Sequence, residues 1–218
     1  TFFAERVLLP SFSDSQRAMV LSQGGSGGAW LRAIPSERIF QMSPLRFQVA
    51  IRRRLHWPLP LTSHTCRGQA CKKLQDEFGH HPASCNRSGL LKARSRPIEK
   101  VWARVLREGG ARVRENVTLR DAGIPVGASD GRQIEVVVTG LPIEHGIPVA
   151  VDATMVSPLH ADGTPHAGAA ARPGVALERG RKDKERTYPE LLTSSRLRLL
   201  TAAVETGGRM SKDALRLL

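Results

Sequence analysis

The clearest helical pattern in the chain lies between Pro97 and the paired glycines Gly109 and Gly110. Apolar residues recur there at intervals of three and four: Ile98, Val101, Trp102, Val105 and Leu106. This spacing predicts an amphipathic helix, which begins at Pro97 because a first helical turn accommodates proline and ends at the glycines. The opposite face is basic, and it suits either solvent or phosphate contacts. Its basic residues are Lys100, Arg104 and Arg107.

Two runs rich in β-branched residues, 134–138 and 147–151, predict strands. The segment TGLPIEHG between them is too short for the crossover that a parallel pair needs, so we expect an antiparallel hairpin. A third strand is predicted over 112–119, where Val113, Val117 and Leu119 alternate with polar residues.

Other segments give weaker patterns. The sequence SPLRFQVAIRRRL over 43–55 predicts a short basic helix, and QGGSGG over 23–28 predicts a flexible linker. Residues 160–174 predict an irregular, mobile loop, and 179–186 form the mixed-charge run RGRKDKER. Leucines and small residues after Pro189 predict a second long helix that ends at Gly207 and Gly208. Together these patterns predict an α/β (α+β) fold.

Length and charge narrow the functional classes. The 218 residues suffice for one domain with a smaller module attached. The chain has 33 Lys and Arg against 20 Asp and Glu, a formal net charge of +13. Such a charge attracts polyanions, and a nucleic acid is the leading candidate. The alternative is a basic surface that serves solubility alone.

The ends of the chain and its cysteines bear on location. No run of about 18 apolar residues is present, so we expect no membrane span and no membrane partner. A charge follows TFFA at the start, which is atypical of a signal peptide. Scarce cysteine then favours a reducing, intracellular compartment. A start at Thr1 and an abrupt end at Leu218 indicate a piece of a longer polypeptide.

All three cysteines cluster around one histidine, in the order C-x4-C-x9-H-x3-C. A disulfide would leave one thiol unpaired, whereas four ligands suit a tetrahedral Zn²⁺ site. Four protein ligands leave no open position, so this zinc would be structural. His80 competes with His81, and the spacing to the last cysteine favours His81; three unrelated free thiols are the alternative. The expected ligands are Cys66, Cys71, His81 and Cys85.

Two acids flank the predicted hairpin. In an antiparallel pair, Glu135 and Asp152 fall at the same end of the sheet, where both carboxylates reach one cation. Mg²⁺ accepts such ligands and retains waters for chemistry. Lys184 is the candidate for a third group that neutralises developing charge. The alternative is that both acids are solvated turn residues.

The order of these segments resembles the region that follows the reverse transcriptase in non-LTR retrotransposons with a restriction-like endonuclease. The similarity covers nearly the whole chain. It implies a linker over 1–60, a zinc knuckle over 61–90 and an endonuclease domain of the PD-(D/E)xK type over 91–218. The segments that carry it are AWLRAIP, SPLRFQVAIRRRL, the Cys/His cluster, the basic helix, GRQIEVVVTGLP, IPVAVDATMVSPL and KDKERTYPEL.

The resemblance also implies roles for individual residues. Cys66, Cys71, His81 and Cys85 match the knuckle ligands. Asp152 matches the second acid of the nuclease motif, and Lys184 with Tyr188 resembles its downstream K-x3-Y. Glu135 stands where the family has the Asp of its Pro-Asp pair, a departure that lengthens the side chain by one methylene.

The implied function is Mg²⁺-dependent nicking of target DNA in the nucleus, so that the exposed 3′ hydroxyl primes reverse transcription of the element's RNA. The partners would be DNA and element RNA, with a reverse transcriptase domain on the same longer polypeptide. Two alternatives stay open, a non-catalytic nucleic-acid-binding module and a decayed nuclease relic. The residues expected on nucleic-acid phosphates are Arg87, Lys92, Arg94, Arg96, Arg104 and Arg112.

Overall fold

The chain divides into two compact units in a computed structural model that describes residues 9–61, 65–66, 71–85, 87 and 91–218. The side chains of Ser26 and of residues 91–93 lie outside this description. The sheet unit comprises Lys92–Met155, Leu177–Val204 and Met210–Leu218. The N-terminal unit comprises Thr1–Leu91, Val156–Ala176 and Glu205–Arg209.

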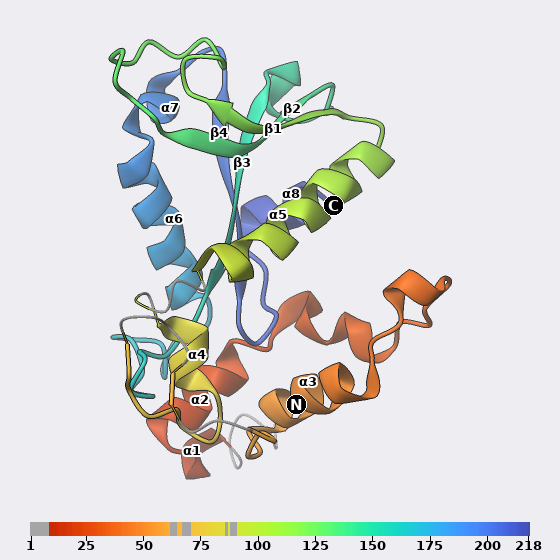
Figure 1. Ribbon diagram of the computed structural model, residues 1–218, viewed down its shortest axis with the longest axis vertical. Coiled ribbons are helices and arrows are strands. Elements are labelled where there is room, and N and C mark those ends of the chain that lie inside the picture. The colour runs from red at the N-terminus through yellow and green to blue at the C-terminus, as the bar shows by residue number, and fades with distance from the viewer. Residues whose placement is uncertain (1–8, 62–64, 67–70, 86, 88–90) are drawn as a thin grey trace. The chain divides into compact units, whose positions relative to one another are not determined.

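A four-stranded sheet forms the centre of the sheet unit, with the strands in the order β1-β2-β3-β4 (Figure 1). Both β1 and β3 pair antiparallel with β2. The β4 strand runs parallel to β3, since the Arg198 amide donates to the Pro148 carbonyl and the Thr206 amide donates to the Val156 carbonyl. The strands are β1 (Arg112–Thr118), β2 (Gln133–Thr139), β3 (Val149–Val156) and β4 (Arg198–Glu205).

Helices cover both faces of this sheet. On one face, Trp102 and Leu106 of α5 and Ala214 of α8 pack with the β-branched residues of β2 and β3. On the other face, Tyr188 and Leu191 at α7 pack with Val137, Ala150 and Leu197, and Lys184 of α6 reaches Asp152 of β3. The helices are α5 (Leu91–Glu108), α6 (Val175–Thr187), α7 (Pro189–Thr193) and α8 (Lys212–Arg216), and η4 (Glu144–Gly146) is a short 3₁₀ turn. The mixed sheet between helical layers agrees with the predicted α/β (α+β) class.

The hairpin and the third strand confirm the sequence patterns, but α5 differs in two respects. It begins at Leu91, so Pro97 lies inside the helix and not at its start. The side chain of Val101 is 59% exposed, whereas Trp102, Ala103 and Leu106 are buried. The buried stripe therefore runs along the 102, 103 and 106 positions, which are also spaced by three and four.

The predicted long helix after Pro189 is wrong. The α7 helix ends at Thr193, and residues from Arg198 form β4. Leu197, Leu199 and Leu200 fit helical spacing as well as strand spacing. The strand is buried on both faces, from Leu200 to Ala203 without interruption, and such a strand lacks the alternation that would have identified it.

The N-terminal unit is built from short helices. Ser13 caps α2 through a capping box with Gln16, and Ser43 caps α3, whose first residue is Pro44. Ala18 and Met19 of α2 pack with Leu159 and Ala169 from the loop 157–174. Its helices are α1 (Leu9–Ser11), α2 (Asp14–Leu21), η2 (Gly25–Leu31), η3 (Arg38–Phe40), α3 (Pro44–Leu55) and α4 (His80–Ser84).

The glycine-rich segment predicted as a flexible linker, residues 23–28, continues into η2, which begins at Gly25. Its glycines permit close packing, because a Cβ at Gly27 would lie 2.8 Å from the Gly208 carbonyl carbon. The Arg209 amide donates to the Ser22 carbonyl nearby. The segment is therefore held against residues 207–209. The loop expected over 160–174 is made of turns and includes a short bridge between Leu159 and Pro165.

Among the described residues, no helix is both long and apolar enough to cross a membrane.

Candidate functional site

Two acids meet on the sheet face that carries α6 and α7. The β2/β3 register pairs Val136 with Val151, which sets Glu135 beside Asp152 on the adjacent strand. Both side chains share the face of Val137, against which Tyr188 and Leu191 pack. The Glu135 Oε2 atom accepts a hydrogen bond of 2.7 Å from the Ala153 amide. The longer glutamate side chain therefore spans to the neighbouring strand.

Lys184 and Tyr188 join these acids from the end of α6. The Lys184 Nζ lies 2.6 Å from the Asp152 Oδ1. Tyr188 follows one helical turn later, where its amide donates to the Lys184 carbonyl, and its hydroxyl donates to the Gln133 carbonyl at 2.7 Å. These four residues form the acidic centre, which is the set that the sequence singled out: Glu135, Asp152, Lys184 and Tyr188.

A charged network fixes the α6/α7 junction beside β2. Arg132 donates to Glu190 Oε1 at 2.6 Å and also binds Asp130 at 2.6 Å. It donates to the Thr187 carbonyl as well. Because Arg132 directly precedes β2, these contacts tie the residue before Tyr188 to the strand that carries Glu135.

The surroundings of Glu135 and Asp152 raise the pKa values of both carboxyl groups. Burial raises the pKa of Glu135 well above its usual range, and the nearby Asp152 raises it further, although Lys184 opposes the change. Burial likewise raises the pKa of Asp152 against the attraction of Lys184. Burial and the two acids raise the pKa of Tyr188, so its phenol stays protonated. A buried and a half-buried acid beside a single lysine therefore favour a further positive charge at this centre.

The donor atoms of this centre are compatible with a divalent cation. Both Asp152 side-chain oxygens are buried, and the Oδ1 contacts the Lys184 Nζ at 2.6 Å, so a cation bound here would share this carboxylate with the lysine. Glu135 uses Oε2 for the Ala153 amide and has a second oxygen available. Hard cations bind such oxygens, and Mg²⁺ needs only one or two carboxylates because it keeps several waters.

Glu99 is a further acid at this centre that sequence reasoning missed. Its negative charge raises the pKa values of both Glu135 and Asp152, so it lies within electrostatic reach of them. Glu99 is half-buried and lies on α5, about one helical turn before the buried Trp102 and Ala103. An acid that precedes the apolar positions of an amphipathic helix by three and four residues is the signal that could have found it.

The second candidate site is the Cys/His cluster of the N-terminal unit. Cys66, Cys71, His81 and Cys85 bring one ligand atom each to within 4.8 Å of one another, and they could hold a metal ion. The Cys71 Sγ lies 3.3 Å from the His81 Nε2 and 3.5 Å from the Cys85 Sγ. Sulfur atoms around a tetrahedral zinc are separated by roughly 3.8 Å, so the cluster is compatible with zinc.

The surrounding backbone orients His81. The Asp76 carboxylate accepts hydrogen bonds from the amides of Phe78, His80 and His81 at 3.1, 2.8 and 2.7 Å. These bonds fix the turn that starts α4. The His81 Nδ1 lies 3.3 Å from the Ala161 carbonyl, which leaves Nε2 directed at the thiols.

His80, the competing ligand, lies outside the cluster. Its Nε2 is 3.2 Å from the Nε2 of His56, and its ring stacks near Phe78. Burial lowers its pKa to about 4. His80 is therefore a neutral residue of the packed interior.

The basic residues expected on nucleic acid differ in their surroundings. Arg87, Arg96 and Arg112 are exposed. Arg104 pairs with Glu108 at 2.6 Å across one helical turn of α5. The side chain of Lys92 lies outside the described part, and Arg94 is half-buried.

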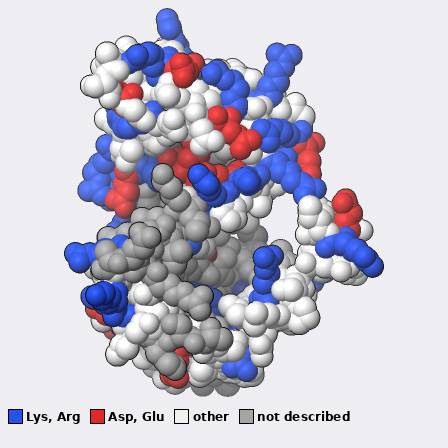
Figure 2. Space-filling model, viewed as in Figure 1, with Lys and Arg blue, Asp and Glu red and all other residues white. Residues whose placement is uncertain are grey.

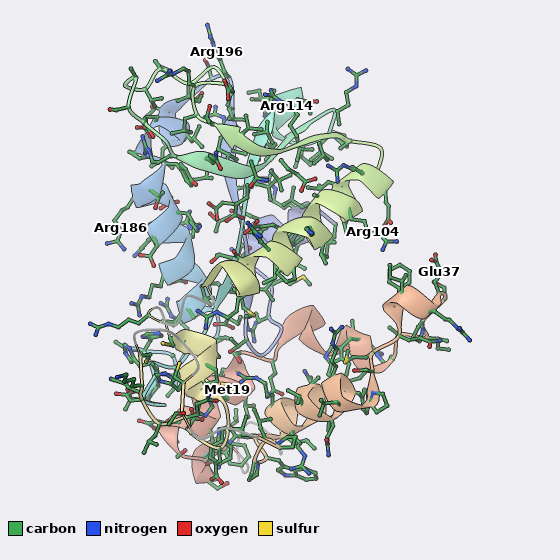
Figure 3. The ribbon with its side chains drawn as sticks, viewed as in Figure 1. Met19, Glu37, Arg104, Arg114, Arg186 and Arg196 are labelled. Atoms are coloured by element: carbon green, nitrogen blue, oxygen red, sulfur yellow. The ribbon has the colours of Figure 1, made fainter. Side chains whose placement is uncertain are left out.

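Lysine and arginine side chains dominate the charged surface of the visible face (Figure 2). Arg186 and Arg196 extend outward from the sheet unit (Figure 3). Both are exposed. A basic surface of this kind suits a polyanion.

A comparison of the sequence with protein-family models and with curated proteins found no match to either.

Proposed function

We propose that the sheet unit is a metal-dependent DNA endonuclease of the PD-(D/E)xK type that nicks target DNA for a retrotransposon. One observation carries this proposal. The buried Asp152 and the half-buried Glu135 lie opposite each other on adjacent strands, and the Lys184 Nζ is 2.6 Å from Asp152. Phosphodiester hydrolysis needs cation-binding carboxylates and a positive group near the phosphate, and these residues supply both.

Glu135 and Asp152 would hold Mg²⁺, which supplies polarisation of the scissile phosphate and a bound water of lowered pKa. Lys184 already offers its ammonium at the Asp152 carboxylate, where it can stabilise negative charge that develops on the phosphate. Tyr188 stays protonated and holds the end of α6 to β2 through the Gln133 carbonyl. Lys184 lies on a helix and not on the strand of Asp152, so the Tyr188 contact sets its position.

The Cys/His cluster would hold a structural zinc ion in this proposal. Its four protein ligands fill a tetrahedral shell and leave no position for substrate. Zinc there stabilises the turn at α4 and the Ala161 segment that contacts His81. DNA and element RNA would be the partners, with a reverse transcriptase domain on the same polypeptide and a nuclear site of action.

A non-catalytic nucleic-acid-binding module, or a decayed nuclease relic, is the second candidate. The specific observation in its favour is the direct ion pair between Lys184 and Asp152, which compensates the buried acid without any metal. The glutamate at position 135 points the same way, since the related motif carries an aspartate. The net charge of +13 supports nucleic-acid binding in either case.

The test is nicking of a supercoiled plasmid by zinc-loaded protein in the presence of Mg²⁺. We expect the parent to nick and Asp152→Asn to abolish nicking. The matched control is Asp183→Asn, which removes an exposed acid of α6 that pairs with Arg186 and should not change the rate.

Equal nicking by the parent and Asp152→Asn would exclude the assigned centre. Plasmid binding by both proteins, without nicking by either, would leave the binding module or relic as the function.

A further inference from the structure

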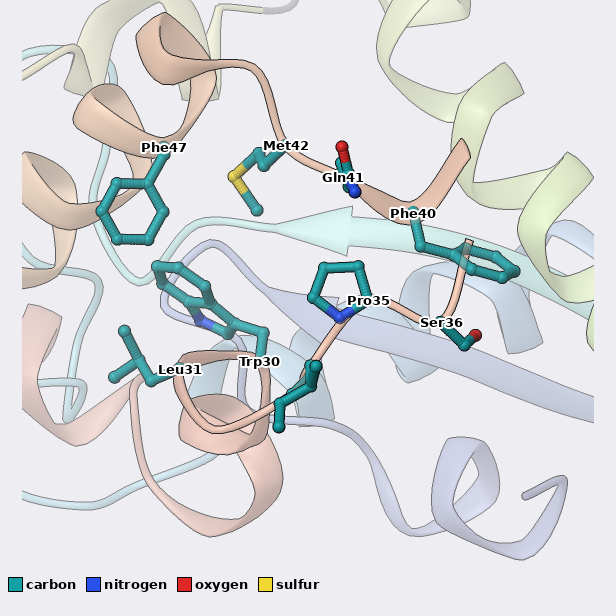
Figure 4. A pocket seen from close by; sticks show the side chains of 10 residues that line it. Trp30, Leu31, Pro35, Ser36, Phe40, Gln41, Met42 and Phe47 are labelled. Atoms are coloured by element: carbon teal, nitrogen blue, oxygen red, sulfur yellow. The ribbon is translucent and has the colours of Figure 1, made fainter. Parts of the chain in front are cut away.

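A pocket of about 640 Å³ opens in the N-terminal unit between η2, η3 and the start of α3 (Figure 4). Its wall is aromatic and apolar, and two polar side chains, Ser36 and Gln41, complete it. The volume lies in the range of sites that bind small ligands. The main apolar groups in the wall are Trp30, Ile34, Pro35, Phe40, Met42 and Phe47.

The apolar wall is open to solvent. Ile34 is 92% exposed and Phe40 is 49% exposed, although both are large apolar residues. Trp30 and Phe47 are arranged edge to face, with their ring centroids 6.0 Å apart and their planes at 80°. A monomeric protein rarely exposes such a contiguous apolar surface without a ligand for it.

The charge around this pocket has one sign. Residues 30–47 contain three arginines and a single acid, Glu37. Arg32, Arg38 and Arg46 form no ion pair with any described acid. Glu37 lies at the tip of this part of the chain (Figure 3). The surroundings of the pocket are therefore complementary to a polyanion.

The polar groups of the wall are available for recognition. No hydrogen bond joins Ser36 or Gln41 to another described residue through its side chain. An amide and a hydroxyl both donate and accept hydrogen bonds, as the edges of nucleobases do. An apolar peptide would leave these groups and the arginines unmatched.

We infer that this pocket binds unpaired bases of a single-stranded nucleic acid. Bases stack on the rings of Trp30, Phe40 and Phe47, while the neighbouring arginines contact the backbone phosphates. Duplex DNA hides its base faces and cannot enter in this way. The inference is separate from the nuclease proposal, because every residue that carries it lies within residues 30–47.

The test measures binding of a fluorescein-labelled oligothymidylate by fluorescence anisotropy. The protein is the full zinc-loaded chain with Asp152→Asn, so that cleavage does not interfere. We expect Trp30→Ala and Phe40→Ala each to weaken binding by about 5- to 150-fold, the effect of one lost base stack. Phe40→Tyr keeps an aromatic ring and should bind as the parent does.

Trp57→Ala is the matched control, since Trp57 is 56% exposed in the same unit but does not line the pocket. It should bind like the parent. Circular dichroism of each variant checks folding, and a duplex of the same length should bind Trp30→Ala as tightly as it binds the parent.

Three results would overturn the inference. The first is that Trp30→Ala and Phe40→Ala both bind oligothymidylate as tightly as the parent. The second is that Trp57→Ala loses as much affinity as these variants do. The third is that Trp30→Ala loses as much affinity for the duplex as for oligothymidylate. Sedimentation that detects a dimer dissociated by Phe40→Ala, with oligothymidylate binding unchanged, would assign the pocket to a second copy of the chain. None of these outcomes depends on nicking.

Discussion

Glu135 reaches further than an aspartate could. Its Oε2 accepts the Ala153 amide of the neighbouring strand at 2.7 Å, a contact that a side chain shorter by one methylene would lose. Active-site geometry tolerates displacements of only about 0.5 Å. In this fold, the length of the Glu135 side chain therefore fits the distance to the Ala153 amide on the neighbouring strand.

We accordingly expect Glu135→Asp to slow plasmid nicking by up to about 10²-fold, because the carboxylate retracts from its position. Single-turnover nicking at saturating Mg²⁺ measures this effect. A faster Glu135→Asp variant would contradict the structural argument and would identify the glutamate as a damaging substitution.

Glu205 gives a prediction for stability against pH. It is buried beside Arg209, whose Nε lies 3.6 Å from its Oε2, yet burial raises the pKa of Glu205 to about 7. Between about pH 4.3 and 7 the folded chain then binds more protons here than the unfolded chain. Its contribution to stability is therefore greatest at low pH and falls as pH rises through this window.

We expect Glu205→Gln to remove that fall, since glutamine does not ionise. Thermal unfolding of both proteins across the window measures the difference in Tm as a function of pH. Parallel Tm profiles for the two proteins would rule out a raised pKa at Glu205.

At the scale of elements, glycines set the packing of the N-terminal unit. A Cβ at Gly207 would lie 2.1 Å from the Ser22 Oγ and 2.7 Å from the Ser22 backbone. We expect Gly207→Ala to destabilise the chain by about 1–3 kcal/mol through this overlap. The control is Gly127→Ala, where nothing lies within 4 Å of the new methyl group.

Urea unfolding of both variants gives the comparison. Gly127→Ala should leave stability unchanged or raise it by up to about 1 kcal/mol. Equal stability of Gly207→Ala and the parent would mean that the 205–209 segment does not need this close contact.

The sequence predicted those elements in which apolar residues recur at a regular spacing. It failed for elements that are buried on both faces, because such elements lack the alternation of apolar and polar residues. The apolar spacing of α5 and the β-branched runs of β2 and β3 were sufficient, and the hairpin then placed Glu135 beside Asp152. The β4 strand is buried on both faces, and the spacing of its apolar residues also fits a helix. Glu99 and the wall around Trp30 were not predicted, because each depends on which face a segment turns toward its neighbours.

At the scale of the whole molecule, the formal net charge of +13 predicts how nucleic-acid binding responds to salt. Each phosphate contact releases a counterion, so the logarithm of the affinity should fall linearly with the logarithm of the salt concentration. The slope for a duplex is about −0.9 per phosphate contact. Anisotropy titrations at several salt concentrations measure it, and affinity indifferent to salt would exclude both nucleic-acid roles.

The chain passes between its two units more than once. After β3 it contributes Val156–Ala176 to the N-terminal unit, and after β4 it contributes Glu205–Arg209. The carbonyl that faces His81 belongs to Ala161, so the environment of the Cys/His cluster includes a residue from the second half of the chain. During synthesis, the surroundings of the candidate metal site would be completed at Ala161, before β4 is made, and no single cut would yield either unit whole.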